Sequence, residues 1–236
     1  MVDFISEVEE ELRKDDYNKF LRKFGPVILG LLIAVVAFVG YLEWRDYAQD
    51  RTARAAAASY LAADDLLNDG RPDAAAAEWL KLADVAPDGY AGLSLMRAAV
   101  IAAEQGNAAE AVRLYDAAAD RFELRRHTDL AKLKAAYVLA NQGQWGDVSL
   151  RVDELLAEGA PYEYLARELA ASAALAQGQD GEARDQFTYL NTIPGVPPTI
   201  ARRAEQALTL MDVSAAVPTP TDTTSEGELP APEGTE

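Results

Sequence analysis

The sequence contains no cysteine and a single histidine, and these absences exclude several kinds of site. A chain without cysteine forms no disulfide, carries no thiolate nucleophile and offers no sulfur ligand to a metal. His127 stands alone, whereas a zinc helix needs two histidines and a Ser-His-Asp triad needs further candidates around one. It lies beside Arg125 and Arg126, where we expect a surface turn. No phosphate-binding loop of the form G-x-x-x-x-G-K-[ST] is present. We therefore expect no enzyme, no cofactor and no metal site.

Basic residues are also scarce. The 22 lysines and arginines face 39 aspartates and glutamates, and the formal net charge is −17. Such a surface repels phosphate backbones, so nucleic-acid binding is not expected. Acid pairs such as Asp64 and Asp65 point about 100° apart on a helix, so we expect them on solvated faces rather than in a converging dyad.

Glycine and proline are few outside two short regions, while alanine is abundant. Alanine loses no side-chain entropy in a helix, so this balance favours helices. Half of the residues are apolar, which is enough to build a packed core. The composition predicts an all-α protein.

One long apolar run stands out near the N-terminus. Residues 25–42 read GPVILGLLIAVVAFVGYL and carry no charge. As a helix they extend about 27 Å, close to a bilayer core of roughly 30 Å. Pro26 suits a first helical turn, and Tyr41, Trp44 and Tyr47 fit an interfacial aromatic belt. We predict a transmembrane helix rather than the alternative, a buried core helix.

The basic residues around this run predict its orientation. Five precede it and three follow it closely; they are Arg13, Lys14, Lys19, Arg22 and Lys23, then Arg45, Arg51 and Arg54. The excess keeps the N-terminus in the cytoplasm and sends the following domain across the membrane. A cleaved signal peptide, with Val35 and Ala37 before the cut, is the alternative. The seven acidic residues that precede the run favour an uncleaved anchor.

The flanking segments differ in character. Residues 1–24 form a cytoplasmic arm that is first acidic and then basic. We expect a helix over residues 3–23, with a break at Asp15 and Asp16. The arm is either a docking helix for a partner or a solvated targeting arm. Residues 43–212 have helical periodicity. Residues 213–236 are acidic and rich in Pro and Thr, so we expect a disordered tail.

An internal repeat organises residues 43–212. Four glycines, at Gly70, Gly106, Gly143 and Gly178, are spaced 36, 37 and 35 residues apart, and each separates two helical patterns. Seven residues before each glycine there is an alanine; these are Ala63, Ala99, Ala136 and Ala171. Five residues after it there is a small residue; these are Ala75, Ala111, Val148 and Ala183. Nine residues after it there is a larger side chain; these are Trp79, Tyr115, Val152 and Phe187.

This pattern predicts four helical hairpins, each with a helix A and a helix B. The glycine ends helix A in a left-handed conformation, and the small residues let the two helices approach. The larger residue, which we call the bulky slot, fills the space toward the next hairpin. Trp79 and Tyr115 should therefore be buried.

The repeat resembles the tetratricopeptide repeat. The segment QGNAAEAVRLYDAA (105–118) matches its turn and second helix, and Pro87 falls where that motif closes. The sequence departs from the motif in two ways. The motif usually has a glycine in helix A, where this chain has alanines, and the motif's early tryptophan is absent. The resemblance implies an α-solenoid of about four hairpins, which the segment 196–212 would cap.

The same resemblance implies that helices A line a concave, partner-binding face. The residues that would point inward are Tyr60, Leu93, Met96, Val100, Leu130, Leu133, Tyr137 and Leu165. Met96, Leu133 and Tyr137 would form its centre, suited to loose capture of apolar peptide segments. Alternatively, several of these side chains pack helix A against its neighbours.

The whole arrangement resembles the ancillary subunit of the bacterial Sec translocon. An acidic start (DFISEVEEELRKDD), a basic run, one span and tetratricopeptide-like repeats carry this resemblance. It implies a single-pass inner-membrane protein with periplasmic repeats. Its partners would be translocon subunits, exported clients and a membrane-anchored prolyl-isomerase-like chaperone. The alternative function is a structural adaptor of an envelope or cell-division complex.

Overall fold

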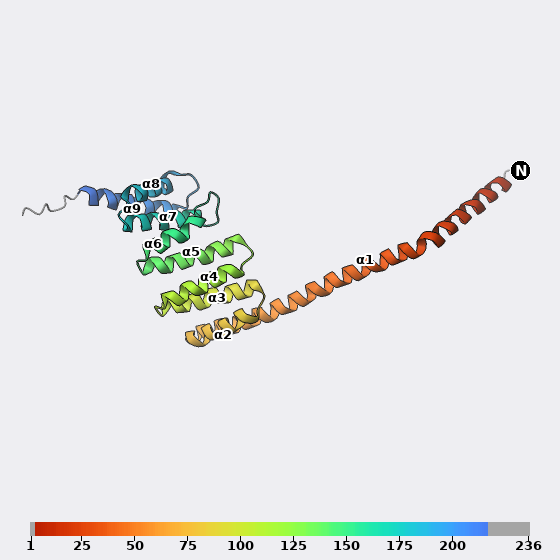
Figure 1. Ribbon diagram of the computed structural model, residues 1–236, viewed down its shortest axis with the longest axis horizontal. Helices are drawn as coiled ribbons and strands as arrows, with labels where there is room; N and C mark the ends of the chain where they lie inside the picture. Colours follow the sequence, from red (N-terminus) through yellow and green to blue (C-terminus); the bar gives the residue numbers. More distant parts are fainter. Residues whose placement is uncertain (1–2, 217–236) are drawn as a thin grey trace, which may run out of the picture.

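The computed structural model describes residues 3–216, which are helices joined by short connections (Figure 1). In chain order the elements are α1 (Asp3–Asn68), α2 (Pro72–Val85), α3 (Asp88–Glu104), α4 (Ala108–Arg121), α5 (Arg125–Asn141), α6 (Trp145–Val152), the 3₁₀ helix η1 (Asp153–Leu155), α7 (Glu163–Ala176), α8 (Asp180–Thr192) and α9 (Pro198–Ala216). The end of α1 pairs with α2, and α3–α4, α5–α6 and α7–α8 form three further hairpins. Each hairpin packs on the next, and α9 closes the stack. The predicted all-α solenoid of four hairpins with a capping helix is confirmed.

The four repeat glycines end helix A as predicted. Gly70, Gly106, Gly143 and Gly178 all have φ between 71° and 78°. At the second turn, the N–H of Gly106 donates to the carbonyl of Ala103 at 3.0 Å. Asn107 then caps α4, because its side chain accepts the N–H of Glu110. Only glycine adopts this left-handed backbone without strain, so these positions fix where each hairpin turns.

The bulky slots are buried between hairpins. Trp79 is fully buried, and Tyr115, Val152 and Phe187 are at most 4% exposed. The alanines on both sides of each turn are buried as well, so neighbouring helices approach closely. The predictions for Trp79 and Tyr115 are confirmed.

A cation from the next hairpin covers the first two bulky slots. The Arg97 guanidinium lies 5.3 Å from the Trp79 ring centre, and the Lys134 ammonium lies 6.0 Å from that of Tyr115. Both cations stand nine residues before the glycine of their own repeat. In the third interface the equivalent residue is Leu169, which shares a core cluster with Val152. In these three interfaces a cation lies over each aromatic slot and an aliphatic residue packs on the aliphatic one. The fourth slot, Phe187, packs among apolar residues such as Ile200.

Two features of α1 differ from the sequence predictions. α1 continues through Asp15 and Asp16 without the predicted break. It also runs on from the apolar segment into the repeats, where no glycine or proline stands between Gly40 and Gly70 to end it. Pro26 consequently lies inside α1 rather than in a first turn. α1 bends in its N-terminal part (Figure 1), in the region where a proline removes a backbone hydrogen bond.

At the other end, α9 extends to Ala216, so the first residues assigned to the tail are helical. The rest of the predicted tail, 217–236, lies outside the described residues. The docking face predicted for the N-terminal arm depends on side chains that also lie outside them.

Within the described part of the chain, α1 is the one helix long and apolar enough to cross a membrane, and its apolar window is entirely unburied. Length and composition alone would allow a signal sequence in the same place.

Candidate protein-binding face

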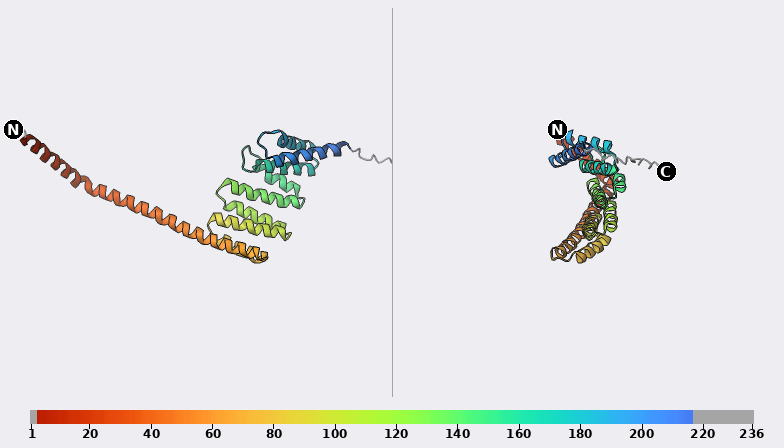
Figure 2. Two further views of the ribbon diagram at one scale, coloured as in Figure 1. Left: turned by 180° about the vertical axis from the view of Figure 1, so that it is seen from behind. Right: turned by 90° about the vertical axis from the view of Figure 1, so that its left-hand side faces the viewer.

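The face that helices A present is formed by the end of α1 and by α3, α5, α7 and α9, and we call it the A-helix face. The stack of hairpins curves as an arc in the right-hand view of Figure 2. Of the eight predicted inward residues, two are well exposed on this face: Leu93 at 41% and Tyr137 at 37%. Tyr60, Met96, Val100, Leu130 and Leu165 are half-buried. The structure brings these residues to one series of helices but does not test whether they bind a partner.

Leu133 was predicted at the centre of an open groove, and this placement is wrong. Its side chain is only 2% exposed and belongs to a core cluster with Val152 and Leu169. The position ten residues before the turn glycine lies at the seam between neighbouring helices. In the third hairpin this seam is closed by the apolar residues of α6 and α7, so Leu133 is core.

Several other inward residues also pack inside the solenoid. The Tyr60 ring lies 6.0 Å from Trp79 and 6.3 Å from Tyr90. Met96 and Val100 rest on the cluster around Tyr115. The predicted set therefore divides into packing residues and residues that are available to a partner, with Leu93 and Tyr137 the most accessible.

A cavity of about 300 Å³ opens on this face between three helices. It is lined by Tyr137 of α5, by Glu168, Leu169 and Ser172 of α7, and by Arg203 of α9. Three of these residues, Tyr137, Glu168 and Ser172, hold positions that the repeat pattern places inward. The volume accommodates one large side chain or a short stretch of extended peptide, at the low end of ligand-site sizes.

The polar groups of the cavity are arranged around one ion pair. Arg203 donates two hydrogen bonds to the Glu168 carboxylate, at 2.5 and 2.6 Å, and Glu168 is only 15% exposed. Burial raises the pKa of Tyr137, the negative charge of Glu168 raises it further, and Arg203 opposes both effects. The phenol therefore remains a neutral hydrogen-bonding group at physiological pH. The cavity combines apolar wall, neutral phenol and balanced charge, which suits a peptide segment without strong net charge.

Within the part of the chain that the structure describes, no group of histidine, aspartate and glutamate side chains is arranged to hold a metal ion. The cavity holds a half-exposed phenol and a carboxylate already paired with a guanidinium. This arrangement offers hydrogen bonds and contact surface to a bound chain.

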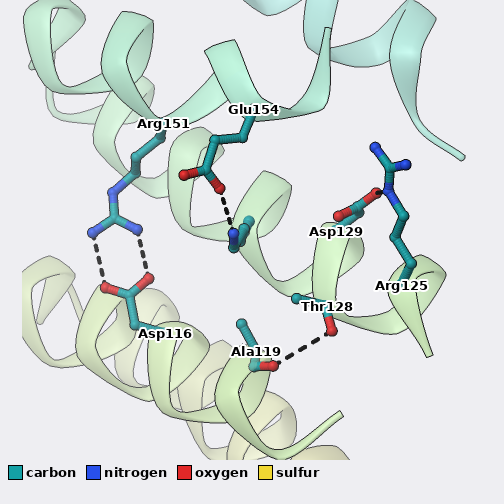
Figure 3. A network of polar contacts seen from close by, with 8 residues as sticks. Asp116, Ala119, Arg125, Thr128, Asp129, Arg151 and Glu154 are labelled. Carbon is teal, nitrogen blue, oxygen red and sulfur yellow. Dashed lines mark hydrogen bonds and ion pairs between the residues drawn. The ribbon is translucent and has the colours of Figure 1, made fainter. Parts of the chain in front are cut away.

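Sequence reasoning missed the role of Arg203, which lies in the segment 196–212 that was predicted only to cap the solenoid. The missed signal is an acid followed by an arginine about one repeat later. Glu168 and Arg203 are 35 residues apart, as are Asp116 and Arg151. The Asp116–Arg151 pair joins the second hairpin to the third, and the Glu168–Arg203 pair joins the fourth hairpin to the capping helix α9. Figure 3 shows the Asp116–Arg151 pair bridging α4 and α6. The pair Asp64–Arg97 follows the same rule at 33 residues. Asp88 and Arg121 are also 33 residues apart, but they join the two helices of one hairpin.

A family model of the tetratricopeptide repeat-like domain matches residues 18–192. The chain belongs to this tetratricopeptide repeat-like family. The match spans most of the chain and starts ahead of the apolar run, so the unit that the family model describes includes the apolar part of α1 as well as the four hairpins. Neither the curated proteins nor the solved structures contain a match to the chain.

The third tetratricopeptide-like hairpin is irregular, and a buried ion pair compensates for it. Its helix B, α6, has 8 residues, whereas α2 and α4 have 14. The connection that follows is held by Glu163, which accepts the N–H of Gly159 at 2.8 Å and Nε of Arg167 at 3.0 Å. Arg167 also donates to the carbonyl of Leu156 at 3.2 Å. Glu163 and Arg167 therefore secure the loop that replaces the missing end of helix B.

Replacing Glu163 by glutamine should destabilise the repeat domain in a pH-dependent way. Burial raises the pKa of Glu163, but the Gly159 N–H and the Arg167 guanidinium lower it by more, to below the ordinary value of 4.5. The carboxylate therefore contributes stability above that value, and the contribution is lost as pH falls through the lowered pKa. We expect Glu163→Gln to lower the free energy of unfolding by about 1.5–3 kcal/mol at pH 7. As the pH falls below 4.5 and through this lowered pKa, the wild-type and variant melting temperatures should converge. A difference that stays constant from pH 7 to pH 3 would show that the charge of Glu163 is not what stabilises the loop.

Proposed function

We propose that this chain is a membrane-anchored scaffold that holds segments of partner proteins on its A-helix face. The proposal is supported by membership of the tetratricopeptide repeat-like family, whose solenoids present extended binding surfaces. The apolar part of α1 supports a single-pass anchor. The basic excess before the span favours a cytoplasmic N-terminus and repeats on the opposite, periplasmic side of the inner membrane.

In its finer form, the proposal is that the protein is an ancillary subunit of the Sec translocon. It would assist exported proteins directly or recruit a membrane-anchored prolyl-isomerase-like chaperone to them. The support is the order of the acidic start, basic run, span and repeats in the sequence. A structural adaptor of an envelope or cell-division complex would use the same face and is the alternative.

The observation that carries the proposal is the cavity around Tyr137. It is built by α5, α7 and the capping helix α9, and three of its residues hold inward positions of the third and fourth repeats. A partner segment that crosses this face meets the exposed Leu93 and Tyr137 in turn, with balanced charge around them. The contrast with the chain's strongly negative total charge makes this face suited to neutral and apolar peptide segments.

Site-specific photo-crosslinking in cells tests the proposal. A photoreactive phenylalanine analogue in place of Tyr137 should crosslink to translocon subunits or to an exported protein arrested in transit. The same analogue in place of Leu150 is the matched control, because Leu150 is 77% exposed on α6, a helix B. Adducts with division or envelope proteins at position 137 would favour the adaptor function. Equal crosslinking from both positions would contradict a binding role for the A-helix face.

A further inference from the structure

The connections that lead from each helix B to the next helix A lie on one edge of the stack, and we call this the anchor-side edge. Because α3, α5, α7 and α9 run in the same general direction as the end of α1, their first turns lie toward the side from which α1 leaves the stack. Figure 1 shows these connections on the side of the stack where α1 departs toward its N-terminus. A cavity of about 610 Å³ is lined by Pro87, on this edge, and by Trp44 and Arg45 of α1. The edge therefore comes close to the interfacial aromatic residues that follow the span.

The first turn of α5 carries charges of unusual sign for this chain, although Glu123 of the preceding connection is acidic. The helices α2, α3, α4, α6, α7 and α8 each have an acidic residue in their first turn, where the helix dipole favours it. By contrast, α5 begins with Arg125 and Arg126 and has no acid there. Cations in a first turn oppose the helix dipole. Arg125 has a local role, because its Nε donates to the nearly buried carboxylate of Asp129 at 3.2 Å. Among the described residues Arg126 makes no such pair, so its position on the anchor-side edge, rather than local helix stability, accounts for it.

The same connection presents an exposed leucine on a braced loop. Leu124 is 54% exposed. Phe122, two residues earlier, turns its side chain toward α3. Its ring lies so close to Gly92 that a Cβ at that position would come within 2.7 Å of the ring. The centres of the Phe122 and His127 rings are 5.2 Å apart. Thr128 donates to the carbonyl of Phe122 at 3.1 Å. The loop is thus fixed with its phenylalanine half-buried and its leucine in solvent, next to two exposed arginines.

We propose that Leu124 and Arg126 rest on anionic lipid headgroups of the bilayer that α1 spans. This inference relies on the membrane anchor of the proposed function but not on the A-helix face. An anionic surface attracts basic side chains within about one Debye length, roughly 8–10 Å. The rest of the chain is acidic and is repelled by such a surface. Contact through Leu124 and Arg126 therefore gives the solenoid a preferred orientation, in which its anchor-side edge faces the membrane.

The absence of cysteine makes a direct test possible, because one introduced cysteine can be labelled alone. The full chain is reconstituted into vesicles and labelled with an environment-sensitive fluorophore at Leu124→Cys or at Gln142→Cys. These positions lie at opposite ends of α5, and both are exposed. In vesicles containing phosphatidylglycerol, a lipid-attached quencher should quench the label at 124 and leave the label at 142 unaffected. In vesicles of phosphatidylcholine alone, quenching at 124 should fall.

A charge reversal then tests the role of the arginine. Arg126→Glu in the Leu124→Cys chain removes one attractive contact and adds a repulsive one. Removal alone should reduce the contact equilibrium about fivefold, the equivalent of the ~1 kcal/mol that one basic side chain contributes near an anionic surface. Reversal should reduce it further. Arg113→Glu is the matched control, since Arg113 is exposed on α4 away from this edge, and it should have no effect.

Two results would overturn the proposal. The first is equal quenching at positions 124 and 142, or none at 124 in anionic vesicles. The second is quenching at 124 that does not respond to lipid charge or to Arg126→Glu. Flotation of the vesicles reports the anchor separately: a chain that does not float with them overturns the anchor and the loop contact together. Loss of quenching with normal flotation overturns the loop contact alone and leaves the proposed scaffold function intact.

Discussion

Replacing Trp79 by alanine should lower the free energy of unfolding by about 3–5 kcal/mol. Trp79 is fully buried between the first two hairpins and is among the largest fully buried side chains. Its removal would leave a cavity lined by Ala63, Ala75 and Ile101, and Arg97 would lose the ring beneath it. Since each hairpin is stabilised mainly by its neighbours, the loss should separate the first hairpin from the second.

The melting temperature of the full chain in detergent, followed by circular dichroism, measures this loss. The expected decrease is on the order of 10 °C for a domain of this size. Two matched variants show how large the effect of Trp79→Ala on the melting temperature is by comparison. Leu80→Ala, at the next residue of α2, should change little because Leu80 is 36% exposed. Trp79→Phe should cost much less than alanine, because the indole N–H has no hydrogen-bond partner within the described structure. An unchanged melting temperature in Trp79→Ala would show that the bulky slot does not join the hairpins.

Leu133→Glu should unfold the centre of the solenoid, whereas Leu93→Glu should leave it folded. Leu133 is 2% exposed among apolar residues, so a glutamate there would be a buried and unpaired charge. Such a change costs more than about 4 kcal/mol. Leu93 is 41% exposed, so the same substitution should change stability by less than about 0.5 kcal/mol.

Unfolding by urea of the two variants side by side measures this contrast. The comparison separates core from available surface on the same series of helices. If both variants were equally stable, the burial of Leu133 would not contribute to folding. If both were destabilised, Leu93 would be a packing residue and the A-helix face would offer less surface than proposed.

The sequence predicted those features that depend on short-range constraints. Gly70 and its three equivalents need a left-handed backbone, and that need is local, so their spacing gave the hairpins directly. The burial of Trp79 followed from its constant distance from a turn. The continuity of α1 was not predicted: a break was expected at Asp15 and Asp16, and the helix runs through both. Periodicity defined the apolar span and the repeats, but it does not report whether a helix ends between them.

Features that depend on neighbouring repeats were not predicted. Leu133 occupies the same repeat position as Met96, yet it is buried while Met96 is half-buried, because the residues of the next hairpin decide how the seam closes. Arg203 pairs with Glu168 across 35 residues, and a pattern within one helix contains no sign of that partner. The candidate cavity arises from this pair together with Tyr137. Tyr137 was predicted to point inward, but the combination of side chains that lines the cavity was not predicted.

Co-purification of the detergent-solubilised chain with translocon subunits tests the central claim, which is protein binding through the A-helix face of a membrane-anchored scaffold. The chain is compared with Leu93→Glu and with Leu150→Glu, whose site is exposed on a helix B. All three should enter the membrane and show the same melting temperature. We expect partner recovery with the wild type and with Leu150→Glu, and at least a tenfold loss with Leu93→Glu. Equal recovery from all three, or no recovery from the wild type with any membrane complex, would contradict the account.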